Sequence, residues 1–196
     1  MGAEERLRAE FYEFLASLLA RPPSPETLRG LTTLEGDETD LGKAVKTLAR
    51  VASRVTPEAA EREFHDLFIG LGRGELLPYA SVYMTGFLNE KPLAKLRDDM
   101  SRLRISRADD VFEPEDNAAS LFDMMAGLIR GRFTGQPAPL AEQQAFFAAH
   151  MGSWMAHFFA DLEGAKRSVL YAPVGAVGKA FIEIEREAFR MEGAAS

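Results

Sequence analysis

Cysteine is absent from the 196 residues of this chain. Its absence excludes a disulfide framework, a thiolate nucleophile and any zinc or iron–sulfur site with cysteine ligands. Long apolar runs are also missing. None approaches the roughly 18–20 residues that span a bilayer, so stable membrane insertion is not expected. Glu10 and Glu13 interrupt the apolar run near the N-terminus, which is not typical of a secretory signal, and a cytoplasmic protein is expected.

Basic residues are fewer than acidic residues. The chain has 23 Lys and Arg against 30 Asp and Glu, a formal net charge of −7 and a pI near 5.1. Such an acidic surface argues against binding to nucleic acid or to an anionic membrane, and it favours a basic partner. Because 46% of the residues are hydrophobic, the chain is still able to bury a core.

Patterns that indicate an enzyme are scarce. Neither GxSxG nor SxxK, the usual settings of a catalytic serine, occurs in the sequence. His150 and His157 would lie about 10 Å apart along a helix, which is too far for one metal ion. No catalytic residue, cofactor or metal site is therefore predicted.

Two glycine motifs match nucleotide-binding loops only in part. GLGRG at 70–74 follows a predicted helix rather than a strand. GAVGK at 175–179 has Pro173 in place of the first glycine and Ala180 in place of the residue that would bind magnesium. Turn and helix-start glycines are the simpler interpretation, and a nucleotide-binding helical protein remains the less favoured alternative.

The spacing of apolar residues is helical almost everywhere. The first stripe, which Pro22 and Pro23 end, consists of Leu7, Phe11, Phe14, Leu15, Leu18 and Leu19. Ser24-Pro25 and Thr56-Pro57 are typical helix starts. Further helices are predicted over 37–54, 92–104 and 121–129, as one long helix from Phe147 through Leu162, and over 177–188.

Three polar or glycine-rich segments, 70–81, 106–115 and 131–139, are predicted to be loops. No segment alternates as a strand would, and no internal repeat occurs. The sequence therefore predicts an all-α fold, a single helical bundle domain over residues 1–196.

The first candidate binding segment is LLPYASVY, residues 76–83. It places Pro78, Tyr79, Ser81 and Tyr83 directly after an amphipathic helix. Aromatic side chains on a loop provide rigid contact area for a peptide. The alternative is that the two tyrosines simply complete the core.

The second candidate segment is VFEPEDN, residues 111–117, with carboxylates at Glu113, Glu115 and Asp116. Carboxylates in the first turn of a helix complement its dipole, and Pro114 suits the first helical position. The same carboxylates are suited to a bound cation. The two interpretations are compatible, because a carboxylate can cap a helix and still face a guanidinium.

In this order, the two segments resemble the TorD/DmsD/NarJ family of redox-enzyme maturation chaperones. The stretch EFHDLFIGLGRGELLPYASVY, residues 63–83, resembles the family's E-x-x-x-L-F-x-G followed by P-Y-x-S-x-Y. FEPEDNAASLFDMM, residues 112–125, resembles its E-P-x-D-H element, with Asn117 where His is usual. Residues 8–28 and 142–162 resemble the family's first helix and its long C-terminal helix more loosely.

The resemblance implies a TorD-like helical fold and a cytoplasmic chaperone without catalytic activity. Such a chaperone binds the apo catalytic subunit of a molybdenum-cofactor oxidoreductase, often through its twin-arginine leader, and delays export until the cofactor is inserted. The implied roles are a groove shaped by Pro78, Tyr79, Ser81 and Tyr83, and a second element comprising Glu113, Pro114, Asp116 and Asn117. In that element, Glu113 and Asp116 would meet arginine or order the loop.

Asn117 cannot titrate, so an imidazole-dependent role is not expected, whereas a role in shape or hydrogen bonding remains open. Tyr79→Ala and Asp116→Ala are each expected to weaken client binding and to leave the melting temperature nearly unchanged.

A second interpretation keeps the fold but has a non-exported oxidoreductase subunit as client, bound outside a leader. The resemblance also implies a monomer or a domain-swapped homodimer, with a hinge in 106–116 or 131–139.

Overall fold

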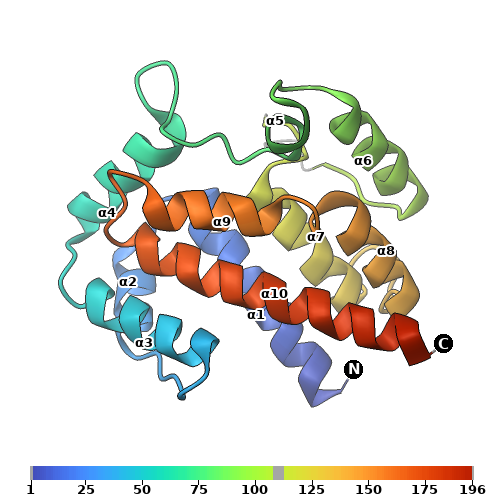
Figure 1. Cartoon of the computed structure of the whole chain (residues 1–196), viewed down its shortest axis with the longest axis horizontal. Coiled ribbons are helices and arrows are strands. Elements are labelled where there is room, and N and C mark those ends of the chain that lie inside the picture. Colours follow the sequence, from blue (N-terminus) through green and yellow to red (C-terminus); the bar gives the residue numbers. More distant parts are fainter. Residues whose placement is uncertain (1, 108–112, 196) are drawn as a thin grey trace. The chain divides into compact units, whose positions relative to one another are not determined.

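The computed structural model describes residues 2–107 and 113–195, and within these ranges it contains helices and no β-strand (Figure 1). The all-α prediction is confirmed. The helices are α1 (Ala3–Ala20), α2 (Pro25–Thr32), α3 (Asp40–Ala52), α4 (Pro57–Phe64), a π-helical turn (His65–Ile69), α5 (Ala80–Thr85), α6 (Lys91–Arg102), α7 (Ala118–Arg130), α8 (Leu140–His150), α9 (Met155–Gly164) and α10 (Tyr171–Ala195).

Two predicted helix starts are confirmed in detail. The side chain of Ser24 accepts a hydrogen bond from the amide of Thr27 at 3.1 Å, and Pro25 opens α2. Thr56 caps α4 in the same way, through the amide of Ala59 at 3.2 Å. In both cases a hydroxyl satisfies an amide that has no partner within the helix.

The described residues group into two compact units. Unit 1 comprises residues 1–20 and 78–154, and unit 2 comprises residues 21–77 and 155–196. The predicted hinge ranges, 106–116 and 131–139, both fall inside unit 1, and residues 108–112 of the first lie outside the described part of the chain. The first candidate segment belongs to unit 1 from Pro78 onward, and the described residues of the second segment belong to unit 1 as well.

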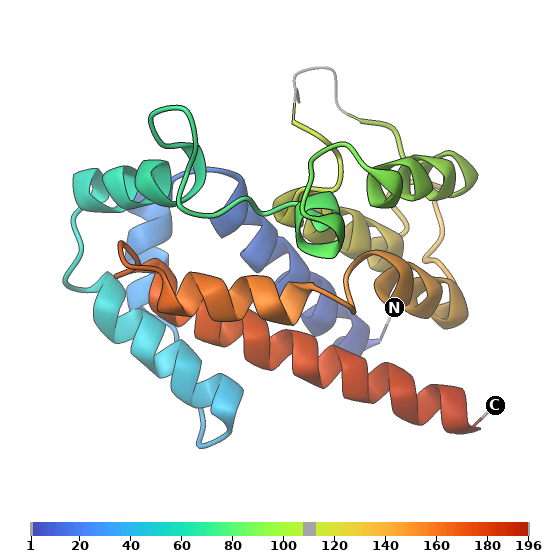
Figure 2. The same ribbon diagram turned by 45° about the horizontal axis from the view of Figure 1, so that its top comes forward.

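The core of unit 1 is centred on the packing of α1 against α7. The rings of Tyr12 and Phe122, both fully buried, lie 5.4 Å apart between these helices. At the edge of the same contact, Arg130 donates to both carboxylate oxygens of Glu13, at 2.6 and 2.8 Å. Figure 2 shows α5 lying beside α6.

Unit 2 is built on α9 and α10, which run side by side (Figure 1). Their backbones approach closely at Gly175, where a Cβ would lie 2.6 Å from the amide nitrogen of Glu163. A Cβ on Gly178 would overlap the ring of Phe159. GAVGK therefore forms part of the α10 helix rather than a phosphate-binding loop, and its glycines serve helix packing.

The prediction of one long helix through Phe147 and Leu162 is wrong. The helical spacing continues, but α8 ends at His150 and α9 begins at Met155. The indole Nε1 of Trp154 donates to the carbonyl oxygen of His150 at 2.7 Å, which satisfies a carbonyl left free at the helix end. Periodicity does not reveal such a break, because the apolar side chains on both sides stay in phase.

Candidate binding site

The two candidate segments are joined by their backbones. The amide of Ala118 donates to the carbonyl oxygen of Pro78 at 2.7 Å, and the amide of Ala80 donates to the carbonyl oxygen of Asp116 at 3.0 Å. The residues between these partners form an isolated antiparallel bridge. Segments far apart in the sequence therefore lie side by side at the N-termini of α5 and α7.

Asp116 is fully buried, and its carboxylate orders the first segment. Its Oδ2 accepts a hydrogen bond from the backbone amide of Ser81 at 2.7 Å. That amide lies in the first turn of α5, where Tyr79 at the N-cap makes no side-chain cap hydrogen bond. Asp116 thus caps α5 from another part of the chain. Because it is buried, this carboxylate is placed to order the loop rather than to face an external arginine.

Asn117 is the N-cap of α7, with its side-chain oxygen accepting from the amide of Ala119 at 2.9 Å. Its side-chain amide donates to Glu113 at 3.0 Å. The prediction that Pro114 occupies the first helical position is wrong, since α7 begins at Ala118 and its first turn contains no acidic residue. The carbonyl oxygen of Pro114 instead accepts from Asn117 in a turn before the helix.

Tyr79 and Glu113 form the accessible part of the site. Tyr79 is half-buried, and it pairs in the isolated bridge with Asn117, whose side-chain amide donates to Glu113. Burial, together with the nearby charge of Glu113, raises the pKa of the Tyr79 phenol, so it stays protonated at neutral pH. Glu113 is exposed. A neutral aromatic hydroxyl therefore lies next to a solvent-facing carboxylate.

Tyr83 lies within the short helix α5. Its ring packs 5.2 Å from the ring of Trp154, which is almost fully buried. Tyr83 itself is partly exposed. Tyr83 therefore contributes in part to the core, as the alternative interpretation of the tyrosines expects. Pro78 and Ser81 of the same segment are buried.

The ion pair between Arg97 and Glu115 was not identified from the sequence. Arg97 on α6 donates to Oε2 of Glu115 through Nε at 3.0 Å and Nη2 at 2.9 Å. Partial burial opposes the charged form of Glu115, but the hydrogen bonds from Arg97, a backbone hydrogen bond and the charges of Arg97 and Arg107 together lower the pKa of the carboxyl. Glu115 already has a cation within the chain, so of the three carboxylates only Glu113 faces outward.

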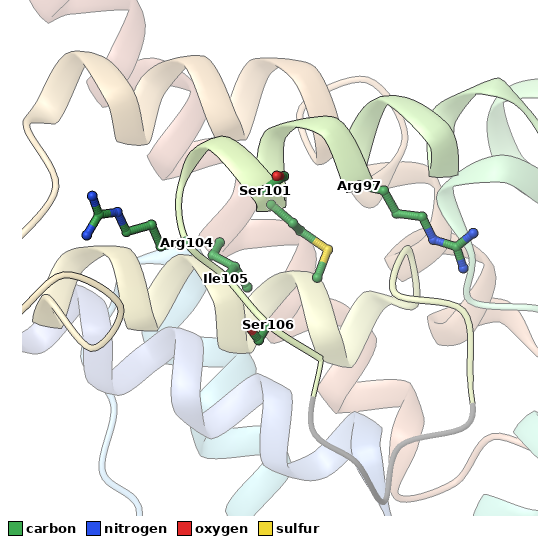
Figure 3. Close-up of a pocket in the computed structure, with 6 residues that line it drawn as sticks. Arg97, Ser101, Arg104, Ile105 and Ser106 are labelled. Carbon is green, nitrogen blue, oxygen red and sulfur yellow. The ribbon is translucent and has the colours of Figure 1, made fainter.

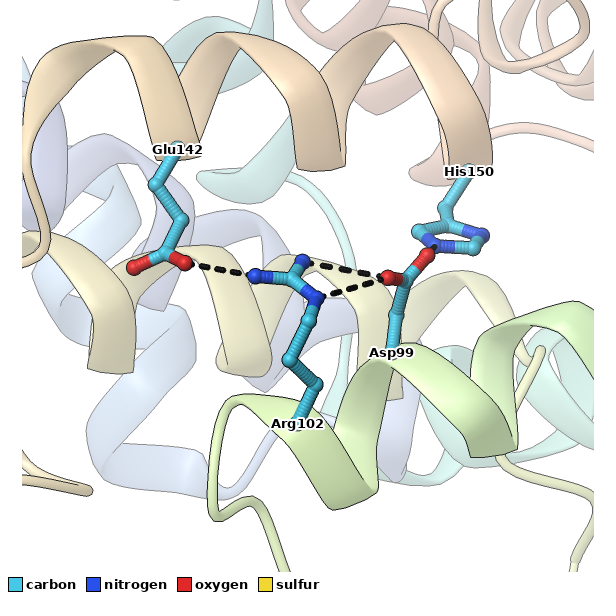
Figure 4. Close-up of polar contacts among 4 residues, drawn as sticks. All are labelled: Asp99, Arg102, Glu142 and His150. Atoms are coloured by element: carbon cyan, nitrogen blue, oxygen red, sulfur yellow. Dashed lines mark hydrogen bonds and ion pairs between the residues drawn. The ribbon is translucent and has the colours of Figure 1, made fainter.

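A polar network holds α6 against α8 (Figure 4). Arg102 donates to Asp99 at 3.0 Å and to Glu142 at 2.7 Å. Nε2 of the buried His150 lies 2.9 Å from the other oxygen of Asp99. These contacts fix the position of α6, and α5 packs against α6.

A hollow of about 350 Å³ lies at the C-terminal half of α6, lined by Arg97, Met100, Ser101, Arg104, Ile105 and Ser106. In Figure 3 the guanidinium groups of Arg97 and Arg104 point in opposite directions. Arg97 is engaged with Glu115. The hollow therefore offers no converging pair of cations for an anionic ligand.

In unit 2, Glu63 is the first residue of the stretch 63–83 that resembles the family. Its buried carboxylate accepts hydrogen bonds from the amides of Val169, Leu170 and Tyr171, at 2.7, 3.0 and 2.8 Å. These amides precede and open α10, so Glu63 caps that helix. Burial, followed by the charge of Glu63, raises the pKa of the Tyr171 phenol. The role of Glu63 is structural.

The comparisons with known proteins agree on one family. The sequence model of the nitrate reductase delta subunit family matches residues 34–160. The chaperone protein TorD of Vibrio atlanticus is 30% identical over 200 residues, covering 92% of this chain and 93% of the relative. TorD of Vibrio cholerae serotype O1 is 31% identical over 199 residues, covering 91% and 90%.

One solved structure shares the fold. A crystal structure described as a redox enzyme maturation protein from Archaeoglobus fulgidus matches with a TM-score of 0.59 at 18% identity, covering 93% of this chain and 96% of that one. This likeness shows that the two chains share a helical fold. The chain belongs to the TorD/NarJ family of redox-enzyme maturation chaperones.

Membership of this family makes the chain a chaperone of the TorD type, a class that takes part in the maturation of molybdoenzymes. The relatives are named as chaperones, in agreement with the prediction of a protein without catalytic activity. Across the described residues, no helix combines the length and apolar character needed to cross a membrane.

Proposed function

We propose that the chain is a cytoplasmic chaperone for the apo catalytic subunit of one molybdenum-cofactor oxidoreductase, and that it binds the twin-arginine leader of this client. It holds the client until the cofactor has been inserted, and it delays export until then. The observation that carries the proposal is the direct backbone connection between the two motif segments at the starts of α5 and α7. This connection gives one surface the features of both segments.

The chemistry of that surface suits a basic peptide. An arginine side chain pairs well with a solvent-facing carboxylate, because charge-assisted hydrogen bonds are the stronger kind. Glu113 is such a carboxylate, and Tyr79 beside it offers an aromatic face and a hydroxyl. Glu115 and Asp116 are committed to Arg97 and to the amide of Ser81. We therefore assign contact with the leader to Tyr79 and Glu113, and assign support of that surface to Pro78, Ser81, Tyr83, Pro114, Asp116 and Asn117.

Affinity capture from the native cytoplasm, with mass spectrometry of the bound protein, tests the proposal. The tagged wild type is compared with a Tyr79→Ala/Glu113→Gln double variant. The control is Asp98→Asn, which removes the same charge from an exposed position on α6. The expected result is one molybdoenzyme precursor bound to the wild type and the control, and depleted from the double variant.

Each other outcome has a definite meaning. Equal recovery of the molybdoenzyme precursor with all three proteins would support the chaperone function and show that this surface does not bind the client. Recovery of an oxidoreductase subunit that has no twin-arginine leader would replace the exported client by a non-exported one. Recovery of no oxidoreductase subunit, in cells that express one, would overturn the proposed function.

A further inference from the structure

An apolar patch lies at the end of the same helix that begins with the first motif. It consists of Met84, Phe87 and Leu88, which are 45%, 71% and 43% exposed. Phe87 is the most exposed phenylalanine in the described part of the chain. Below, these three residues are called the Phe87 patch.

The backbone holds the Phe87 patch in place. Gly86 ends α5 in the left-handed conformation, with φ of 86°, and its amide donates to the carbonyl oxygen of Val82 at 2.8 Å. The hydroxyl of Thr85 donates to the carbonyl oxygen of Ser81 at 2.7 Å and accepts from the amide of Phe87 at 3.3 Å. Phe87 is therefore presented to solvent by an ordered turn.

Keeping these side chains in water has a free-energy cost. Burial of a phenylalanine or leucine side chain against an apolar partner removes this cost. Exposed apolar groups that adjoin one another are typical of interaction sites. The Phe87 patch is therefore expected to be covered in a functional complex.

The position of the Phe87 patch relative to Glu113 indicates what covers it. Glu113 accepts a hydrogen bond from the side-chain amide of Asn117, and Asn117 pairs in the isolated bridge with Tyr79, the N-cap residue of α5. The Phe87 patch is at the C-terminal end of α5. A helix of 6 residues spans about 9 Å, which an extended peptide crosses in about three residues. From the start of α5 to its end, the surface thus offers a carboxylate first and an apolar patch second.

We infer that the Phe87 patch receives the apolar segment of a leader peptide whose arginine pair lies at Glu113. This inference rests on the proposed function, and it adds how the leader peptide is aligned along α5. The charge of Glu113 complements the arginine pair of the leader. The Phe87 patch complements the apolar segment that follows this pair. The first apolar residue in contact is expected about three residues after the pair.

The probe for a test is a fluorescein-labelled synthetic peptide with an Arg-Arg pair, three polar residues and a run of alternating Leu and Ala. Fluorescence anisotropy gives its Kd for the wild-type chain and for a Phe87→Ser variant. A matched control, Leu7→Ser, removes another exposed apolar side chain of unit 1, which is 57% exposed on α1. A second peptide replaces the Leu-Ala run by Ser and Gln, and a third replaces Arg-Arg by Ser-Ser.

Phe87→Ser is expected to weaken binding of the first peptide about tenfold or more, and Leu7→Ser to leave it unchanged. The second peptide is expected to bind wild type and Phe87→Ser alike, because the apolar run is then absent from both complexes. If Phe87→Ser bound the first peptide as tightly as wild type, the patch would have no part in binding. If wild type failed to bind the first peptide, or bound the third equally well, the proposed function itself would be overturned.

Discussion

The backbone amide of Ser81 and Oδ2 of Asp116 are joined by a hydrogen bond of 2.7 Å between two segments that are distant in the sequence. This bond adds to the two backbone hydrogen bonds of the adjacent bridge. Because Asp116 is 0% exposed, its main contribution is to the stability and shape of the surface. The structure thus favours the ordering role for Asp116 over direct contact with arginine.

Asp116→Ala is therefore expected to destabilise the protein by about 1–3 kcal/mol, since it leaves a buried amide at the start of α5 without a partner. This differs from the expectation, made from the sequence, of an unchanged melting temperature. Urea unfolding followed by circular dichroism measures the difference. Asp98→Ala, an exposed change on α6, is the control and is expected to change stability by less than about 0.5 kcal/mol. Equal unfolding midpoints for Asp116→Ala and wild type would contradict the ordering role.

Glu63→Ala removes the carboxylate that accepts hydrogen bonds from three backbone amides at the start of α10. Hydrogen bonds to charged groups are the stronger ones, so the loss is expected to reach about 3 kcal/mol. Thermal and urea unfolding check this. Glu61→Ala, an exposed neighbour on α4, is the matched control. A melting temperature equal to that of Glu61→Ala would show that Glu63 does not cap the helix.

Gly175→Ala tests the close packing of α9 and α10. The added Cβ would lie 2.6 Å from the Glu163 amide nitrogen and 2.7 Å from the Phe159 carbonyl oxygen, so the helices must separate. A destabilisation of about 1–3 kcal/mol is expected. At Gly164, at the end of α9, nothing lies within 4 Å of a Cβ, and Gly164→Ala serves as the control. Equal stability of the two variants would indicate that the contact is readily relaxed.

The contact between His150 and Asp99 predicts a pH dependence of stability. Burial lowers the pKa of His150 below its usual value, against the opposing effect of Asp99, while Lys95 and Arg102 add to the lowering. At Asp99, partial burial opposes ionisation, but hydrogen bonds from His150 and Arg102 outweigh it, and the pKa is lowered. The folded state therefore binds fewer protons than the unfolded state at each group.

The contribution of His150 is fully present above the unfolded histidine pKa of about 6.5, and it decreases as the pH falls through and below that value. The free energy of unfolding of the wild type is thus expected to decrease between pH 7.5 and pH 5.5. In His150→Gln this decrease should be smaller, whereas His157→Gln, an exposed change, should retain it. Urea titrations at several pH values measure both. An identical pH profile for His150→Gln and wild type would contradict the lowered pKa. The contribution of Asp99 is lost only at lower pH, below about 4.

The sequence was sufficient to predict the helical class and several helix starts, because Ser24-Pro25 and Thr56-Pro57 are local signals. It did not predict the end of α8 at His150, where a local hydrogen bond from the Trp154 side chain replaces a helical one. Nor did it predict that Arg97 neutralises Glu115, since pairing across 18 residues depends on the packing of α6. The start of α7 was misplaced because Pro114 and Asn117 are both acceptable near a helix start, and tertiary contacts to Pro78 decide between them.

The central claim is that a leader peptide binds along α5, and photo-crosslinking tests it most directly. A photo-reactive amino acid is introduced at position 84, in the Phe87 patch, and in a second protein at position 7 on α1, which is exposed in the same unit. After irradiation in the native cytoplasm, the cross-linked peptides are mapped by mass spectrometry. We predict cross-links from position 84 to the twin-arginine leader of one molybdoenzyme precursor, and none to that leader from position 7. Cross-links to the leader from position 7 but not from position 84, or cross-links from position 84 to other regions of the client alone, would contradict the account.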